Sequence, residues 1–359
     1  MRSIDDIRRF AVSGLFRRGT LARTLDTLGF VQADPIRAPA RAQDLTLRPR
    51  VEGYRAGDLD RCYQTLPIEE DVFVNYGFVT RSLQSLMHPR TGAALPPTSA
   101  NRRAAALLAF VRERGEVHPR EVDAHFAHGV VTNYWGGSSS ATTHMLEAMH
   151  YKGLLRVVRR EAGIRIYGLR QHEDATTRAA ERRARLDALV DAAVSKYAPL
   201  PAASLSFVLR RLRYAAPQWR TDIAGAIDRA RRRLSQARVD GQTWYWPPLQ
   251  PPTIEPPPDA VRLLAPFDPV VWDRRRFELL WGWPYRFEAY TPAAKRKLGY
   301  YALPVLWRDR IPGWANLSQK AGVLHAEFGY ASGTRPRERA FARELEAELE
   351  RMRTFLRPK

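Results

Sequence analysis

The sequence predicts an α+β protein with tandem winged helix-turn-helix modules, followed by a small β-barrel or curled sheet and a C-terminal helix. Three observations predict this class. Residues 101–170 combine three helical periodicities with two alternating strands around a turn. Residues 176–246 repeat that order after about 80 residues, a spacing typical of tandem modules. Beyond the proline-rich stretch at 247–258, the pattern changes to short strands.

The first two helices can be placed from their ends. Residues 3–13 have apolar positions at helical spacing, with Ser3 as the expected N-cap. A second helix at 20–28 ends at Gly29, a residue type favoured just after a helix. The chain then enters an extended segment that stops at Pro35, because proline has no N–H to donate.

Residues 35–100 carry weaker patterns. We expect a short helix at 58–63 and a buried strand at 71–79. The proline-containing stretch at 94–99 marks a domain boundary near residue 100.

The two modules that follow have helices and strands in the same order. In the first, the helices lie at 101–113, 119–126 and 142–152, and the strands at 154–160 and 164–169. In the second, the helices lie at 177–197, 202–211 and 222–237, and a strand pair lies at 239–246. In a winged helix-turn-helix the third helix meets a DNA groove and the hairpin follows the backbone.

Five short strands and an amphipathic helix are expected after the proline-rich connector. The strands lie at 261–265, 287–289, 299–307, 311–317 and 322–328, and the helix at 335–355. The predicted domains are therefore winged-helix-like at 1–100, winged helices at 101–174 and 175–246, a linker at 247–260, and a barrel with its helix at 261–359.

The charge balance indicates a polyanionic partner. Lys and Arg number 58 against 38 Asp and Glu, for a formal net charge of +20. Arginine pairs bidentately with phosphate oxygens, so double-stranded DNA is the expected partner. A GC-rich genome also raises arginine content, but it should raise acidic residues as well. We expect the protein to bind this DNA as a monomer.

Composition excludes several other classes. No apolar window approaches the roughly 20 residues that a membrane span needs, and the N-terminus lacks a signal-peptide apolar region. The single cysteine, Cys62, excludes an intramolecular disulfide and a thiolate metal cluster. The histidines lack paired ligand spacing and no phosphate-binding glycine motif is present, so we expect no metal and no cofactor. The expected location is the cytoplasm, at a bacterial nucleoid, without a membrane partner.

Gln32 and Asp34 are the candidate catalytic residues. They lie two residues apart in an extended segment, so their side chains should share one face. An amide and a carboxylate on one face can act together on a substrate. Aspartate before proline is also a common turn starter, and from spacing alone that alternative stays open.

Candidate DNA contacts lie on the third helix of the middle module, on its hairpin and in the C-terminal region. They are Thr142, Thr143, His144, Arg156, Arg159, Arg160, Arg165, Arg276, Lys295, Arg296, Arg308 and Arg310. For each side chain alone, a solvated basic face is the alternative.

Three stretches together resemble the AlkZ/YcaQ-like winged-helix DNA glycosylases. They are the Gln-Ala-Asp run at 32–34, the block at 264–276 and the block at 287–307. The likeness spans essentially the whole chain and is strongest from 262 to 317. Three stretches depart from it. At 74–78 the chain reads Val-Asn-Tyr-Gly-Phe where YcaQ-like members typically read Glu-Tyr-Trp-x-His, and 135–138 and 313–314 also differ from the usual pattern.

The resemblance implies a monofunctional DNA glycosylase, a hydrolase that excises alkylated, mainly N7-substituted, purines during DNA repair. Some members also unhook interstrand crosslinks. Gln32 and Asp34 match the Gln-x-Asp form of the YcaQ-like branch. By that likeness, Asp34 is the general base for water attacking C1′, and Gln32 orients the water.

A non-catalytic DNA-binding regulator or architectural protein is the alternative. Winged helices serve transcription control more often than repair. Such a regulator is usually a symmetric dimer on a palindromic site, whereas a repair enzyme binds without sequence preference.

Overall fold

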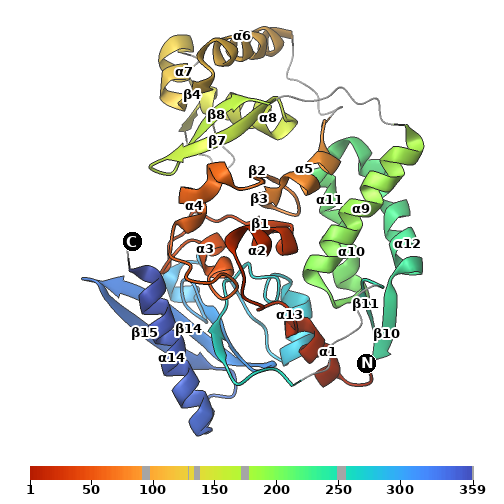
Figure 1. The fold of residues 1–359 in the computed structure, drawn as a ribbon, viewed down its shortest axis with the longest axis vertical. Helices are drawn as coiled ribbons and strands as arrows, with labels where there is room; N and C mark the ends of the chain where they lie inside the picture. Colours follow the sequence, from red (N-terminus) through yellow and green to blue (C-terminus); the bar gives the residue numbers. More distant parts are fainter. Residues whose placement is uncertain (91–97, 128, 133–137, 171–177, 249–255, 358–359) are drawn as a thin grey trace. The chain divides into compact units, whose positions relative to one another are not determined.

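The computed structural model describes residues 1–90, 98–127, 129–132, 138–170, 178–248 and 256–357 (Figure 1). The chain forms two compact units. Unit 1 consists of Met1–Leu59, Val190–Arg210 and Ile227–Lys359, and unit 2 of Asp60–Leu189 and Arg211–Ala226. Each unit combines segments that are far apart in the chain, whereas the predicted domains are consecutive. The predicted domain boundaries remain a prediction. Part of the predicted linker at 247–260 lies outside the described residues.

Unit 1 begins with the two predicted helices. In α1 (Ile4–Val12), the Ser3 hydroxyl accepts the Asp6 N–H at 3.2 Å while the Asp6 carboxylate accepts the Ser3 N–H, so both ends of a capping box are present. Helix α2 (Leu21–Leu28) ends at Gly29, which has φ of +62°. Both predicted helices are confirmed, and strand β1 (Phe30–Gln32) follows directly.

Helix α3 (Ala42–Leu47) also belongs to unit 1 and is buried along its whole length. Further segments of unit 1 come from the middle of the chain. Strands β9 (Leu200–Pro201), β10 (Ser235–Val239) and β11 (Gln242–Trp246) form a sheet in the order β10-β11-β9. Helix α10 (Ala202–Arg210) directly follows β9 in the chain. Helices α9 (Ala179–Tyr197) and α12 (Ile223–Arg233) run through the residues at which the chain passes from one unit to the other.

The C-terminal strands form an open antiparallel sheet rather than a barrel. Its order is β12-β13-β14-β15, with bounds Val261–Leu263, Leu303–Trp307, Arg310–Lys320 and Val323–Tyr330. The outer strands β12 and β15 do not pair with each other, so the predicted barrel is wrong. No strand forms at 287–289 either. Helix α13 (Arg274–Trp281) was not predicted, whereas α14 (Arg339–Leu356) confirms the final helix and packs on β12 (Figure 1).

Unit 2 holds a helical cluster and, within the described residues, three antiparallel strand pairs, β2–β3, β5–β6 and β7–β8. Its elements are α5 (Arg81–Met87), α6 (Thr98–Arg114), β4 (Glu116–Val117), α7 (Pro119–Phe126), β5 (Val130–Thr132), β6 (Ser138–Ser140), α8 (Ala141–Lys152), β7 (Leu155–Glu161), β8 (Ile164–Leu169) and α11 (Leu212–Ala215). Short helix α4 (Asp58–Cys62) leads into it. Leu107, Val122 and Leu146 bring α6, α7 and α8 into one core with the β7–β8 hairpin.

The predicted strand at 71–79 is instead a hairpin. Strands β2 (Ile68–Val72) and β3 (Tyr76–Thr80) pair antiparallel around a turn in which the Phe73 N–H donates to the Asn75 carbonyl at 3.0 Å. Strand β2 carries the acidic run Glu69-Glu70-Asp71, and all three residues are buried. An acidic run is untypical of a buried strand, which explains why the sequence pattern missed it.

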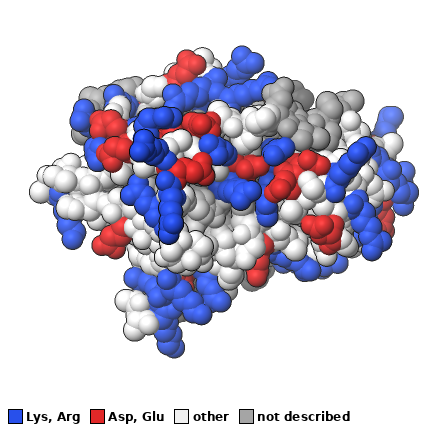
Figure 2. Space-filling model, turned by 90° about the horizontal axis from the view of Figure 1, so that it is seen from below, with Lys and Arg blue, Asp and Glu red and all other residues white. Residues whose placement is uncertain are grey.

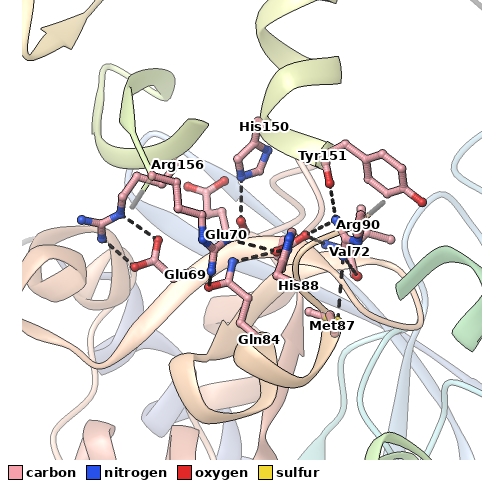
Figure 3. A network of polar contacts seen from close by, with 12 residues as sticks. Glu69, Glu70, Val72, Gln84, Met87, His88, Arg90, His150, Tyr151 and Arg156 are labelled. Carbon is pink, nitrogen blue, oxygen red and sulfur yellow. Dashed lines mark hydrogen bonds and ion pairs between the residues drawn. The ribbon is translucent and has the colours of Figure 1, made fainter. Parts of the chain in front are cut away.

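Basic side chains compensate these buried acids (Figure 3). Asp71 accepts hydrogen bonds from Gln84 at 2.6 Å, from His88 at 2.8 Å and from Arg90 at 2.8 Å. Burial opposes ionisation, but the Arg90 guanidinium holds the pKa of Asp71 well below its usual range. Burial also lowers the pKa of His88 to about 4, so at neutral pH an uncharged imidazole donates to Asp71. The network therefore stabilises unit 2.

A buried ion pair organises unit 1. Arg50 donates to Asp268 through both guanidinium ends, at 2.7 and 3.0 Å, and the two residues are 1% and 0% exposed. Replacing Asp268 by alanine leaves the Arg50 charge buried and unpaired.

We predict that Asp268→Ala lowers the free energy of unfolding by about 3–5 kcal/mol, because an uncompensated buried charge remains. Thermal unfolding followed by circular dichroism measures the effect. The control is Glu350→Ala, which removes an exposed partner of Arg353 and should cost less than about 1 kcal/mol. Equal losses for the two variants would contradict the assigned role of the Arg50–Asp268 pair.

Candidate active site

Gln32 ends β1 and is only 6% exposed. Its side-chain oxygen accepts the indole N–H of Trp272 at 2.9 Å. An indole N–H can only donate, so the amide must turn its oxygen toward Trp272. The amide NH₂ is therefore the group that Gln32 can offer to a substrate or a water.

Trp272 is itself fixed by its neighbours. Its backbone N–H donates to the Asp268 carbonyl at 2.8 Å. Its ring packs against Tyr197, with centroids 4.9 Å apart, and against Phe207 at 5.8 Å. Trp272 lies in the family-like block at 264–276, but no local pattern predicts its role, because its contact with Gln32 spans 240 positions.

Asp34 is half-buried and takes part in a turn. One carboxylate oxygen accepts the Ile36 N–H at 2.9 Å, while the Asp34 N–H donates to the Gln43 side chain at 3.3 Å. The turn interpretation is thus confirmed for one oxygen. The second oxygen has no hydrogen-bond partner among the described residues. Burial raises the pKa of Asp34, and the Ile36 N–H only partly opposes that effect.

Lys196 supports the backbone that leads to Gln32. The amine is buried and donates to the carbonyl of Phe30, and it lies 3.5 Å from the carbonyl of Leu28. Burial, with repulsion from Arg50 in second place, lowers the pKa of Lys196 to about 7. No feature of the sequence singled out this lysine.

Two tyrosines of the C-terminal region lie within the field of Asp34. Burial raises the pKa of Tyr301 and of Tyr290, and the negative charge of Asp34 raises both further. The charge of Asp34 therefore acts on two aromatic residues of a segment more than 250 residues away in the chain.

Two predicted DNA contacts lie in the interior. Thr142 is 0% exposed in α8. Arg276 is 1% exposed and donates to the carbonyls of Tyr197 and Pro269, at 2.8 and 3.1 Å. Neither side chain is exposed in this structure, in contrast to the exposed position that a DNA contact requires.

Three hairpin arginines are bound to the acidic run of β2. Arg156 donates to Glu69 at 2.6 Å (Figure 3), Arg160 donates to Glu70 at 2.6 Å, and Arg165 lies 3.6 Å from Glu70. Their charge is largely compensated inside unit 2. DNA binding by these side chains would have to compete with these ion pairs.

The remaining candidates lie nearer the surface. His144, Lys295 and Arg310 are exposed, and Thr143 is half-buried. Arg159 pairs with Glu116 and Glu161, Arg308 with Asp259 and Glu338, and Arg296 donates to the Thr291 carbonyl. On the face drawn in Figure 2, acidic side chains lie between the basic ones. The Lys and Arg side chains on that face therefore do not form one uninterrupted basic surface, despite the net charge of +20.

One segment that departs from the family pattern has a structural role here. Tyr76, within 74–78, donates its hydroxyl to Glu70, and the Arg165 guanidinium lies over its ring, 4.5 Å from the ring centroid.

Within the described residues, no three potential ligand side chains come together to hold a metal ion. No described helix is long and apolar enough to cross a membrane.

Comparison with known proteins identifies the family. The family model described as DNA glycosylase AlkZ-like matches residues 25–355. The chain belongs to the AlkZ-like DNA glycosylase family. The solved structure of Streptomyces sahachiroi DNA glycosylase AlkZ is similar to it, with a TM-score of 0.62, 14% sequence identity, and coverage of 99% of this chain and 97% of that one. Membership supports a DNA repair glycosylase, and the structural likeness supports the mixed α/β fold.

The raised pKa of Asp34 gives a stability prediction for this AlkZ-like protein. A carboxyl whose folded pKa is raised stabilises the fold below its unfolded pKa, and that contribution is lost as pH rises through the folded value. At pH 7, Asp34→Asn should therefore melt at the wild-type temperature or about 1–3 °C higher. The difference should vanish below about pH 4, near the unfolded pKa. Thermal melts at both pH values measure it, and a lower melting temperature of the variant at pH 7 would contradict the effect.

Proposed function

We propose that this AlkZ-like glycosylase hydrolyses the N-glycosidic bond of alkylated, mainly N7-substituted, purines in double-stranded DNA. Purines crosslinked between strands through N7 are included in the proposed substrate class. The proposal rests on two groups that lie two residues apart in the chain, an amide NH₂ donor at Gln32 and a carboxylate of raised pKa at Asp34. One group donates and the other accepts, which is what a water nucleophile needs from its two sides.

The proposed reaction uses one water. Gln32 donates to the water oxygen, and the free oxygen of Asp34 takes a proton as the water attacks C1′. The C1′–N9 bond breaks, and its electron pair neutralises the cationic N7-alkylated base. Because the base already leaves as a stable neutral molecule, no strong general acid is required. The Asp34 charge also stabilises the oxocarbenium-like sugar.

A monofunctional reaction is proposed because the lysine next to the site is not available as a nucleophile. The lowered pKa of Lys196 would suit one. Its amine, however, is buried and donates to the backbone carbonyl of Phe30, so it is not directed toward a substrate. We therefore expect base release that leaves an abasic site intact.

The helical cluster of unit 2 is proposed to bind DNA as a winged helix. Support comes from its order, in which α6, α7 and α8 precede the β7–β8 hairpin and pack into one core. The exposed His144 lies on α8, the helix that such a module presents to a groove.

A pH profile of base release tests the catalytic role of Asp34. With an N7-methylguanine duplex under single-turnover conditions, the wild-type rate should rise with pH through a pKa above the ordinary aspartate value, because only the ionised carboxylate is a base. Asp34→Asn should be slower by about 10²–10⁴-fold and lose that dependence. A wild-type protein that releases no base, or an Asp34→Asn variant that keeps the full rate, would refute the proposed function.

Trp272→Phe tests the orientation of Gln32. Phenylalanine keeps a ring beside Tyr197 but removes the N–H that holds the amide, so the base-release rate should fall about ten-fold with unchanged DNA affinity. Trp283→Phe is the matched control, because it removes an indole bond to the Ile311 carbonyl elsewhere in unit 1. Equal rates for the two variants would show that the Trp272 N–H does not position Gln32.

A further inference from the structure

A pocket with a volume of about 550 Å³ lies in unit 1 beside the candidate site. Residues 37–39, which follow Asp34 in the chain, form one wall. One face of the β14–β15 hairpin contributes to the other wall through two cross-strand pairs, Asn316 with Glu327 and Ser318 with His325. This volume lies within the range of roughly 300–1,000 Å³ usual for ligand pockets.

Two neighbouring groups of this wall are hydrogen-bond acceptors. The Asn316 NH₂ donates to the Leu298 carbonyl at 2.7 Å, so the amide oxygen points elsewhere, and that oxygen is buried without a partner. Glu327, directly across the strand pair, is exposed and forms no hydrogen bond or ion pair within the described residues. Glu327 thus offers the pocket a carboxylate and a negative charge that no group in the described part of the chain binds.

Tyr301 connects the pocket with the catalytic pair. It lines the pocket, it is 2% exposed, and its hydroxyl has no hydrogen-bond partner among the described residues. A buried hydroxyl without a partner is costly, which favours a ligand that completes it. The charge of Asp34 also reaches Tyr301 and helps to raise its pKa. The pocket therefore lies within the electrostatic range of the proposed base.

The other lining groups suit an extruded nucleotide. Tyr300 is 44% exposed and presents a ring on which a base can stack, with the Arg296 guanidinium 5.0 Å from the ring centroid. Arg37 is an exposed cation that forms no ion pair in the described part of the chain. A cation at the edge of the pocket can bind the flanking phosphate.

We propose that this pocket receives the damaged purine after it leaves the stack, and that Glu327 makes the pocket selective for guanine-type bases. The inference rests on the proposed function. The Watson–Crick edge of guanine carries adjacent N1–H and N2–H donors, which one carboxylate can accept together, and N7-alkylation leaves them in place. Adenine offers one donor and one acceptor, and its acceptor would face the negative charge of Glu327.

Glu327→Gln tests the selectivity, because it replaces one acceptor by a donor and so matches the adenine edge. Under single-turnover conditions, release of N7-methylguanine should fall about ten-fold, and release of N3-methyladenine should stay the same or rise. Glu52→Gln, an exposed site outside the pocket, removes the same charge and should change neither rate. A Glu327→Gln variant with an unchanged ratio of the two rates would overturn the proposal.

A binding experiment separates failure of the pocket from failure of the proposed chemistry. If the wild-type protein releases neither base, the proposed function is wrong, and the pocket is judged by equilibrium titration with N7-methylguanosine and adenosine. The wild type should prefer N7-methylguanosine by about ten-fold, and Glu327→Gln should lose that preference. No preference in the wild type, or one that survives the substitution, would overturn the pocket assignment.

Discussion

The candidate active site depends on one buried ion pair, Arg50 with Asp268. Asp268 accepts the Val270 N–H through its carboxylate and the Val271 and Trp272 N–H groups through its carbonyl. This folds the segment into a tight turn that presents the Trp272 indole to Gln32. Arg50 also donates to the carbonyls of Leu15 and Thr46, so the same guanidinium ties the N-terminal helices to that turn. The orientation of the Gln32 amide therefore depends on the charges of Arg50 and Asp268, which are both buried in unit 1.

Arginine has two roles in this chain, and composition does not separate them. Arg50, Arg90 and Arg276 are almost completely buried, and each satisfies carboxylates or backbone carbonyls of the interior. Arg156 and Arg160 bind the buried acids of β2. A net charge of +20 thus overstates the number of cationic side chains that are available to bind DNA phosphates. This is why several predicted DNA contacts are located in ion pairs or in the core.

The helix ends were predictable because their signals are local. Ser3 and Gly29 cap helices through bonds within a few residues, and the structure has both. The β2–β3 hairpin was not predictable, because its buried acids are compensated by arginines that lie far along the chain. Closure of the C-terminal sheet depends on pairing of its two edge strands, which no local pattern encodes.

The candidate site was half predictable for the same reason. The spacing of Gln32 and Asp34 placed both residues in one segment, whereas the partner that orients the amide comes from Trp272, and the support under β1 comes from Lys196. At Asp34 the turn and the catalytic interpretations are compatible, because one oxygen accepts the Ile36 N–H and the other has no hydrogen-bond partner in the part of the chain that the structure describes.

The most direct test of this account is a crystal structure with duplex DNA that carries a cationic azasugar in place of the damaged nucleotide, as a mimic of the oxocarbenium-like sugar. We predict an ordered water within hydrogen-bond distance of both the Gln32 NH₂ and the second carboxylate oxygen of Asp34, with the Trp272 bond to Gln32 intact. A Gln32 amide turned away from Trp272, or an azasugar bound far from Asp34, would contradict it.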